Sequence, residues 1–187
     1  MAVKKEESAL TYSEYLQMND DIRYEVIDGY IFYMSPFPSV KHQRISVKIS
    51  TEFDNYLRKK DCDVIPEIDV SLEGADDTTK MKEWFRPDIS IICDQDKIKE
   101  NHIAGAPDLI VEILSKSTAK ADKMIKFNRY QAAGVKEYWI VDPAHETVDI
   151  YLLQDGYFVH NGTYISEETI RVSIFDDFSI DLKNIFV

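Results

Sequence analysis

The sequence from Ala106 to Ser115, Ala-Pro-Asp-Leu-Ile-Val-Glu-Ile-Leu-Ser, predicts a strand at the centre of a sheet. Apolar residues occupy both of its faces, Leu109, Val111 and Ile113 on one and Ile110 and Leu114 on the other. Strands of this kind lie inside sheets that are covered on both sides. Glu112 interrupts the apolar run, and a buried carboxylate is costly unless a metal ion, a cation or a proton compensates its charge.

A second strand of the same kind lies upstream, over residues 86–93, and it carries Asp88. If neighbouring strands place Asp88 and Glu112 on one face, their oxygens suit Mg²⁺ or Mn²⁺, which prefer hard oxygen ligands. The alternatives are an exposed strand end for Asp88 and a salt bridge for Glu112. The apolar neighbours of Glu112 favour a functional role, so both residues are candidate metal ligands.

Local signals predict the elements before these two strands. Thr11 and Glu14 have the spacing of a capping box, which begins a short helix. Asp28-Gly29 between two strand-like runs predicts a type I′ hairpin. The other expected elements are an amphipathic helix over 39–60, a strand over 62–72, a mobile loop over 73–82 and a polar connection over 94–105.

The order strand, helix, strand over residues 112–141 predicts a parallel, right-handed β-α-β unit. Its helix is expected to begin within 115–118 and to end at Ala133, with Gly134 as its C-cap. The fold class is therefore α/β, a mixed central sheet flanked by helices. We expect a single domain over residues 1–187, with residues 1–10 flexible.

The composition narrows the classes of function. A net charge of −12 argues against a surface that binds nucleic acid throughout, although basic residues gather over 41–48 and 116–129 and favour a local basic groove. The N-terminus shows no signal-peptide pattern, and no apolar run approaches the ~20 residues of a membrane span. Cys62 and Cys93 follow no metal or redox spacing, which predicts reduced thiols in a cytoplasmic protein.

Lys126 is a candidate because of its position on the helix after the Glu112 strand. It shares a helical stripe with Ala119, Tyr130 and Ala133, so its amine is able to point toward the sheet. The alternative is a solvated ion pair with Asp122, four residues earlier.

His42 lies on the inner side of the long helix, where the alternative to a functional role is a buried, hydrogen-bonded histidine. Glu25, in the first hairpin, pairs with Arg23 or faces water if it has no function. Glu67 is a weaker candidate ligand. Glycine-rich phosphate loops, Cys-x-x-Cys pairs and serine-hydrolase motifs do not occur in the sequence, which argues against those classes.

Several motifs, taken in order, resemble one bacterial family. They are Tyr24–Gly29, His42, Arg86-Pro87-Asp88, Ala106–Ser115, Lys126-x-x-x-Tyr130 and Gly134–Pro143. Together they resemble the Uma-two family, a branch of the PD-(D/E)xK restriction-endonuclease-like superfamily, over about residues 22–187. The resemblance implies a mixed sheet flanked by helices, with acidic metal ligands on two adjacent strands and a lysine nearby.

Asp88 matches the first acid of the superfamily pattern, and Glu112 matches the second. The superfamily lysine stands two residues after the second acid, where this sequence has Leu114. The family places its lysine on the following helix instead, and Lys126 matches it. The resemblance does not establish the family's substrate. The function we expect from these residues is that of a metal-dependent phosphodiesterase, an endonuclease on DNA, in which Asp88 and Glu112 hold Mg²⁺ or Mn²⁺ and Glu25 and His42 position water or the ligands.

Two other classes of function stay open. One is a catalytically inactive module of the same fold with a structural or interaction role, which the acidic charge and the displaced lysine favour. The other is an acidic protein-interaction domain that binds no nucleic acid. Aromatic residues are enriched at interfaces, and those of the second half predict a homodimer: Tyr138, Trp139, Tyr151, Tyr157, Phe158 and Tyr164.

Overall fold

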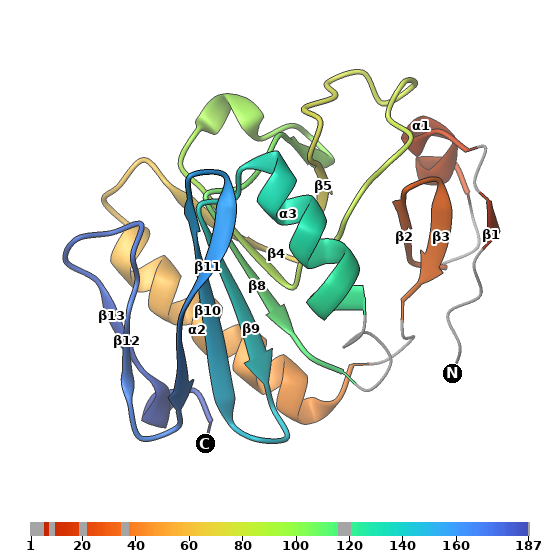
Figure 1. Ribbon diagram of the computed structural model, residues 1–187. Coiled ribbons are helices and arrows are strands. Elements are labelled where there is room, and N and C mark those ends of the chain that lie inside the picture. Colours follow the sequence, from red (N-terminus) through yellow and green to blue (C-terminus); the bar gives the residue numbers. More distant parts are fainter. Residues whose placement is uncertain (1–5, 8–9, 19–21, 35–37, 116–120, 187) are drawn as a thin grey trace.

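A computed structural model describes residues 6–7, 10–18, 22–34, 38–115 and 121–186. At its centre is a six-stranded sheet in the order β11-β10-β9-β8-β6-β4. Figure 1 shows α2 behind this sheet and α3 in front of it, which confirms the predicted α/β class. The elements are β4 (Asp63–Pro66), β6 (Ile89–Ile92), β8 (Leu109–Ile113), β9 (Glu137–Asp142), β10 (Thr147–Gln154), β11 (Tyr157–Ile165), α2 (Val40–Leu57) and α3 (Phe127–Ala133).

Strand β8 lies inside the sheet, between β6 and β9, as its two apolar faces predict. It runs antiparallel to β6, with Val111 opposite Ile89, and parallel to β9. A parallel pair needs a crossover connection, and the segment that contains α3 provides it. All five residues of β8 are buried, so Glu112 lies in the interior.

Two hydrophobic clusters cover the two faces of the sheet. On the α2 side, Ile45, Ile49 and Phe53 pack against the face that carries Val111. The cluster on the α3 side consists mainly of Ile110, Tyr130, Val135, Tyr138 and Ile140. Because side chains alternate along a strand, Glu112 points to the α3 side with Ile110.

The predicted hairpin is formed by β2 (Tyr24–Ile27) and β3 (Tyr30–Tyr33). Asp28 and Gly29 at its turn have φ values of 52° and 75°, as a type I′ turn requires. The short strand β1 (Glu6–Glu7) pairs with β3, so part of the segment expected to be flexible is ordered. Residues 1–5 and 8–9 of that segment lie outside the described residues.

Helix α1 (Tyr12–Leu16) begins at the predicted capping box. The Thr11 side chain accepts a hydrogen bond from the Glu14 backbone, and the Glu14 carboxylate accepts one from the Thr11 backbone at 2.7 Å. The hydroxyl of the buried Tyr12 donates to Asp69 at 2.9 Å. This contact ties the N-terminal part of the chain to its centre.

The hairpin is fastened to the segment that precedes Asp88. The backbones of Val26 and Trp84 bond to each other in both directions, at 3.0 Å each. Trp84 lies four residues before Asp88 in the chain. The pairing therefore brings Glu25, the neighbour of Val26, next to the segment that leads into β6.

The segment over 62–72 forms two strands, not the single strand that its alternation predicts. Glu67 has a φ of 49°, which turns the chain between β4 and β5 (Asp69–Ser71). Strand β5 leaves the central sheet and pairs in parallel with β7 (His102–Ala104). Strand β7 lies within the expected polar connection over 94–105, and three residues are too few for periodicity to reveal a strand.

The helix expected over 115–133 begins with a π-helical turn, η2 (Ala121–Lys126), which leads into α3. Gly134 ends α3 with a φ of 87°, as predicted. Residues 116–120 lie outside the described residues, and with them Lys116, Lys120 and most of the expected N-cap positions. Within the described chain, no helix combines the length and apolar character needed to cross a bilayer.

The remaining elements lie at the margins of the sheet. Strands β12 (Thr169–Arg171) and β13 (Ser179–Asp181) form a two-stranded sheet, and Gln95–Lys97 and Leu182–Asn184 form short 3₁₀ turns. The buried carboxylate of Glu137 on β9 joins this region to the centre. It accepts bonds from the indole of Trp139 at 2.7 Å and from the backbone of Ser173 at 2.7 Å.

Cys62 and Cys93 form a disulfide, so the prediction of reduced thiols is wrong for this structure. The antiparallel pairing of β4 with β6 sets Asp63 opposite Ile92, and the next pair outward is the two cysteines. They are 31 residues apart in sequence, and only the pairing of strands brings them together. The expectation of a cytoplasmic location rested on these two thiols being reduced, so it loses that support.

The aromatic residues that predict a homodimer are mostly used within one chain. Tyr138 and Trp139 are fully buried. Tyr151 and Phe158 pack against the cluster on the α3 side, and Tyr164 against the other cluster. Among these six residues only Tyr157 is largely exposed, at 69%. The homodimer stays a prediction without this support.

Candidate functional site

The carboxylate of Glu112 is compensated by a cation. Glu112 is 3% exposed, and its Oε1 accepts from the Nζ of Lys126 at 3.0 Å and from the hydroxyl of Tyr130 at 2.8 Å. Both partners come from the helical segment that covers this side of the sheet. The salt bridge that the sequence left open as an alternative for Glu112 is therefore present.

Lys126 lies at the junction of η2 and α3, and it is buried, with 3% exposure. Its Nζ stands 2.7 Å from Oε1 of Glu25 and 3.0 Å from Oε1 of Glu112. A solvated helix face, the alternative through Asp122, is excluded by this burial. Single π-helical turns occur often at functional sites, and here one directs a lysine inward between two carboxylates.

Glu25 connects Lys126 with the segment before β6. Besides the ammonium group of Lys126, its Oε1 accepts from the backbone nitrogen of Arg86 at 2.7 Å. Glu25 is buried, so it does not face water, and Arg23 pairs instead with Glu67 at 3.0 Å. The two nonfunctional alternatives for Glu25 are thus wrong.

Asp88 stands at the end of β6, and extending the register of β6 with β8 by one residue sets it opposite Glu112. Its Oδ2 accepts from the backbone nitrogen of Ile113 at 2.6 Å, and its Oδ1 lies 3.3 Å from Nε2 of His42. The Asp88 side chain is 16% exposed, whereas that of Glu112 is 4% exposed. Asp88 is therefore the more accessible of the two candidate ligands.

His42 is buried in the first turn of α2 and faces Asp88. Burial opposes its charged form, but the hydrogen bond and charge of Asp88, with the charge of Glu67, raise the pKa of His42 above its ordinary value. Its Nδ1 is buried and has no hydrogen-bond partner within the described parts of the chain. Glu67 lies close by, because its backbone nitrogen donates to the carbonyl of Asp88 at 3.1 Å.

Tyr130 belongs to this site, although no role was assigned to it from the sequence. Burial, together with the nearby charges of Glu112 and Glu25, raises the pKa of Tyr130 well above its usual value, so its hydroxyl stays a hydrogen-bond donor. The signal for its role is the spacing of four residues from Lys126, which puts both side chains on one helix face.

The structure thus brings together all five residues predicted from the sequence. The ammonium group of Lys126 joins the carboxylates of Glu25 and Glu112. The residue after Glu112, Ile113, donates its backbone N–H to Asp88, and Asp88 contacts His42. Five separate segments of the chain supply these side chains.

The donor set suits a divalent cation that keeps much of its water. Asp88 and Glu112 offer hard carboxylate oxygens, and Mg²⁺ is commonly held by one or two carboxylates. No group of three or more His, Cys, Asp and Glu side chains is arranged to hold an ion in the described residues. A closed protein cage is therefore not present there, but a two-carboxylate site fits the chemistry.

Known proteins resemble this chain over most of its length. The model of the Uma2 family, described as "Putative restriction endonuclease", matches residues 12–183. Two uncharacterized proteins of Synechocystis sp. (strain PCC 6803) are similar. One, slr1290, is 32% identical over 149 residues, covering 78% of this chain and 75% of its own. The other, sll1609, is 28% identical over 147 residues, covering 76% and 80%.

The fold also matches a crystal structure, that of a protein from Anabaena variabilis ATCC 29413 described as a putative nuclease belonging to DUF820. The TM-score is 0.71 at 21% identity, with 95% of this chain and 97% of that chain covered. At this identity the match establishes the shared fold, and it agrees with the mixed sheet and flanking helices described above.

Proposed function

This chain belongs to the Uma2 family, and we propose that it is a metal-dependent endonuclease that hydrolyses phosphodiester bonds in DNA. The family description and that of the structural neighbour both name a nuclease. The observation that carries the proposal is the buried Lys126, held between Glu25 and Glu112, with Asp88 bound to the backbone of Ile113, the residue after Glu112. A cation beside carboxylates that could hold a metal ion suits phosphodiester hydrolysis, because negative charge develops on the phosphate in the transition state.

Asp88 and Glu112 would hold Mg²⁺ or Mn²⁺, and the bound ion would supply positive charge at the scissile phosphate and lower the pKa of its water. Both carboxylates already have hydrogen-bond donors, which fix their orientation. Ligands held in place in this way need little rearrangement when the ion arrives.

Lys126 would stabilise the negative charge that develops on the phosphate, or orient the attacking water. Such preorganised cations are most effective in sites from which water is excluded, and Lys126 is buried. Glu25 acts as a positioning residue, because its carboxylate holds the ammonium group of Lys126 at 2.7 Å. His42 positions Asp88 from the opposite side of the sheet.

DNA contact is supported by the first turns of α2, where Lys41, Arg44 and Lys48 follow one another at helical spacing. Lys41 and Arg44 are exposed and Lys48 is half-buried, and Lys41 also pairs with Glu146. Such a basic stripe attracts the phosphate backbone locally even though the net charge of the chain is −12. A homodimer would suit a two-fold symmetric duplex, and it remains part of the proposal to be checked by light scattering.

The second candidate function is a catalytically inactive module of the same fold with a structural or interaction role. The favouring observation is that Glu112 already has a full cationic partner in Lys126. In that case the pair serves only to compensate a buried charge.

An assay for cleavage of supercoiled plasmid at low salt with Mg²⁺ or Mn²⁺ distinguishes the endonuclease from the inactive module. The endonuclease proposal expects nicking by the wild-type chain and none by Asp88→Asn or Glu112→Gln. Lys126→Met should lose cleavage but retain Mn²⁺ binding, since lysine is not a ligand. The control is Asp61→Asn, an exposed carboxylate outside the site. Equal nicking by wild type and Asp88→Asn would point to a contaminating nuclease and reject the proposal.

A further inference from the structure

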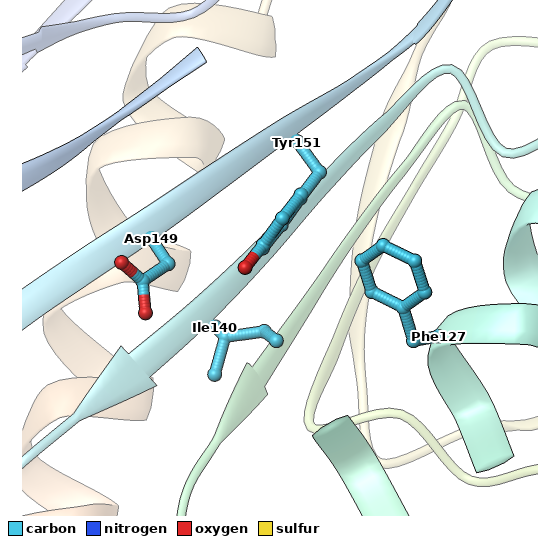
Figure 2. A pocket seen from close by; sticks show the side chains of 4 residues that line it. All are labelled: Phe127, Ile140, Asp149 and Tyr151. Carbon is cyan, nitrogen blue, oxygen red and sulfur yellow. The ribbon is translucent and has the colours of Figure 1, made fainter. Parts of the chain in front are cut away.

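A pocket of about 290 Å³ lies beside the candidate site, on the same face of the sheet. It is lined by Phe127, Ile140, Asp149 and Tyr151. Figure 2 shows Tyr151 and Asp149 projecting from β10, Ile140 from β9 and Phe127 from α3, all toward one space. The volume lies just below the ~300–1,000 Å³ typical of ligand pockets, which suits one ring system and not a larger ligand.

The register of the sheet places this pocket next to Glu112. Glu112 pairs with Ile140 across β8 and β9, and Ile140 pairs with Asp149 across β9 and β10. Directly opposed residues share a face of the sheet, and adjacent strands are about 4.8 Å apart. The backbones at Glu112 and Asp149 are therefore about 10 Å apart. Phe127 directly follows Lys126, so the aromatic wall adjoins the other half of the site.

The pocket combines an aromatic and aliphatic wall with one carboxylate. The rings of Phe127 and Tyr151 meet edge to face, with centroids 4.9 Å apart. Asp149 stands at the other end, where its Oδ1 accepts from Thr163 at 2.5 Å and lies 3.7 Å from Nε2 of His160. Both of these contacts are made by Oδ1, so among the described residues Oδ2 makes no hydrogen bond or ion pair, and Oδ1 retains a second acceptor position beside its bond from Thr163.

We propose that this pocket binds a single unpaired guanine base, in a strand whose backbone lies at the Glu112–Lys126 site. Guanine presents two adjacent donors, N1–H and N2–H, and a carboxylate can accept both because its two oxygens offer about four acceptor positions. Adenine and cytosine place one donor beside a lone pair, which a carboxylate repels. The assignment of the base to a nucleic-acid strand rests on the proposed function.

A quaternary ammonium group is the other ligand that aromatic rings and a carboxylate can attract. Such a cation binds over ring faces, where the quadrupole is negative. The planes of Phe127 and Tyr151 are 89° apart, so the edge of one ring covers a face of the other. That contact removes one of the faces that a cation cage would use, whereas a flat base needs only one open face to stack on.

The test is to titrate the wild-type chain with GMP and with IMP and to monitor binding by ligand-observed NMR. A chelator is present, so that no metal ion takes part. The two nucleotides carry the same charge, and IMP lacks only the N2 amino group. We expect GMP to bind at least about tenfold more tightly than IMP, since a hydrogen bond to a charged group is lost. In Asp149→Asn the preference for GMP should disappear, and in the exposed control Asp61→Asn it should persist.

The inference is overturned by equal binding of GMP and IMP, by no binding of GMP, or by a preference that survives in Asp149→Asn. Choline binding that depends on Asp149, without GMP binding, would assign the pocket to cations instead. Because the titration needs neither metal nor cleavage, its failure is separate from that of the endonuclease proposal. If the chain cleaves plasmid but does not prefer GMP, only the guanine pocket is rejected. If it prefers GMP but does not cleave plasmid, only the endonuclease proposal is rejected.

Discussion

Replacing Lys126 by methionine tests the geometry of the site without any assay of activity. Methionine retains the length and apolar stem of lysine but removes the ammonium group, which lies 2.7 Å from Glu25 and 3.0 Å from Glu112. Two buried carboxylates would then face each other without a cation. Removing one partner of a buried ion pair costs about 3–5 kcal/mol. We expect a loss of this size at pH 8, a large share of the roughly 5–15 kcal/mol that stabilises a domain.

The free energy of unfolding is to be measured by urea titration at pH 8. Combining Lys126→Met with Glu25→Gln should recover part of the loss, since the two residues form one coupled group.

The matched control is Lys41→Met. Lys41 also pairs at 2.7 Å, with Glu146, but the two side chains are 47% and 41% exposed. Pairs of this kind contribute about 0–1 kcal/mol because water screens the charges. A loss from Lys126→Met no larger than that from Lys41→Met would refute the reasoning, since it would mean that Lys126 does not lie between buried carboxylates.

Three further predictions concern the metal, Tyr130 and Glu137. Mn²⁺ at 100 times its Kd should stabilise the wild-type chain by about 2.7 kcal/mol, which is seen as a rise in the thermal unfolding midpoint. Asp88→Asn should abolish this rise, and an equal rise in the wild type and Asp88→Asn would reject the metal site. Tyr130→Phe should lower the free energy of unfolding in urea titrations by about 1–3 kcal/mol, because the buried Oε1 of Glu112 loses the hydrogen bond from the Tyr130 hydroxyl. An unchanged urea midpoint would contradict this. Burial raises the pKa of Glu137 above its ordinary 4.5, against the opposing hydrogen bonds from Trp139 and the backbone. Its stabilising contribution is therefore fully present below the unfolded pKa and is lost as the pH rises through the folded pKa, so Glu137→Gln should destabilise more at pH 4.5 than at pH 8; the same loss at both would be evidence against the raised pKa.

Sequence by itself determined the features that depend on neighbouring residues. Alternation of apolar side chains along 109–113 identified a central strand with Glu112 buried in it. The turn at Asp28-Gly29 and the end of α3 at Gly134 followed from residues that tolerate positive φ. These signals are strong because each arises from backbone geometry or from periodicity over a few positions.

Tertiary structure alone decided which distant residues meet. Lys126 reaches Glu25 because a π-helical turn directs it inward and because Val26 pairs with Trp84, and neither event has a short sequence signal. The disulfide of Cys62 with Cys93 likewise follows from the register of β4 with β6. Contacts of this kind depend on how whole elements pack against one another. The spacing of residues places Lys126 and Tyr130 on one helix face, but it does not specify which distant strand that face meets.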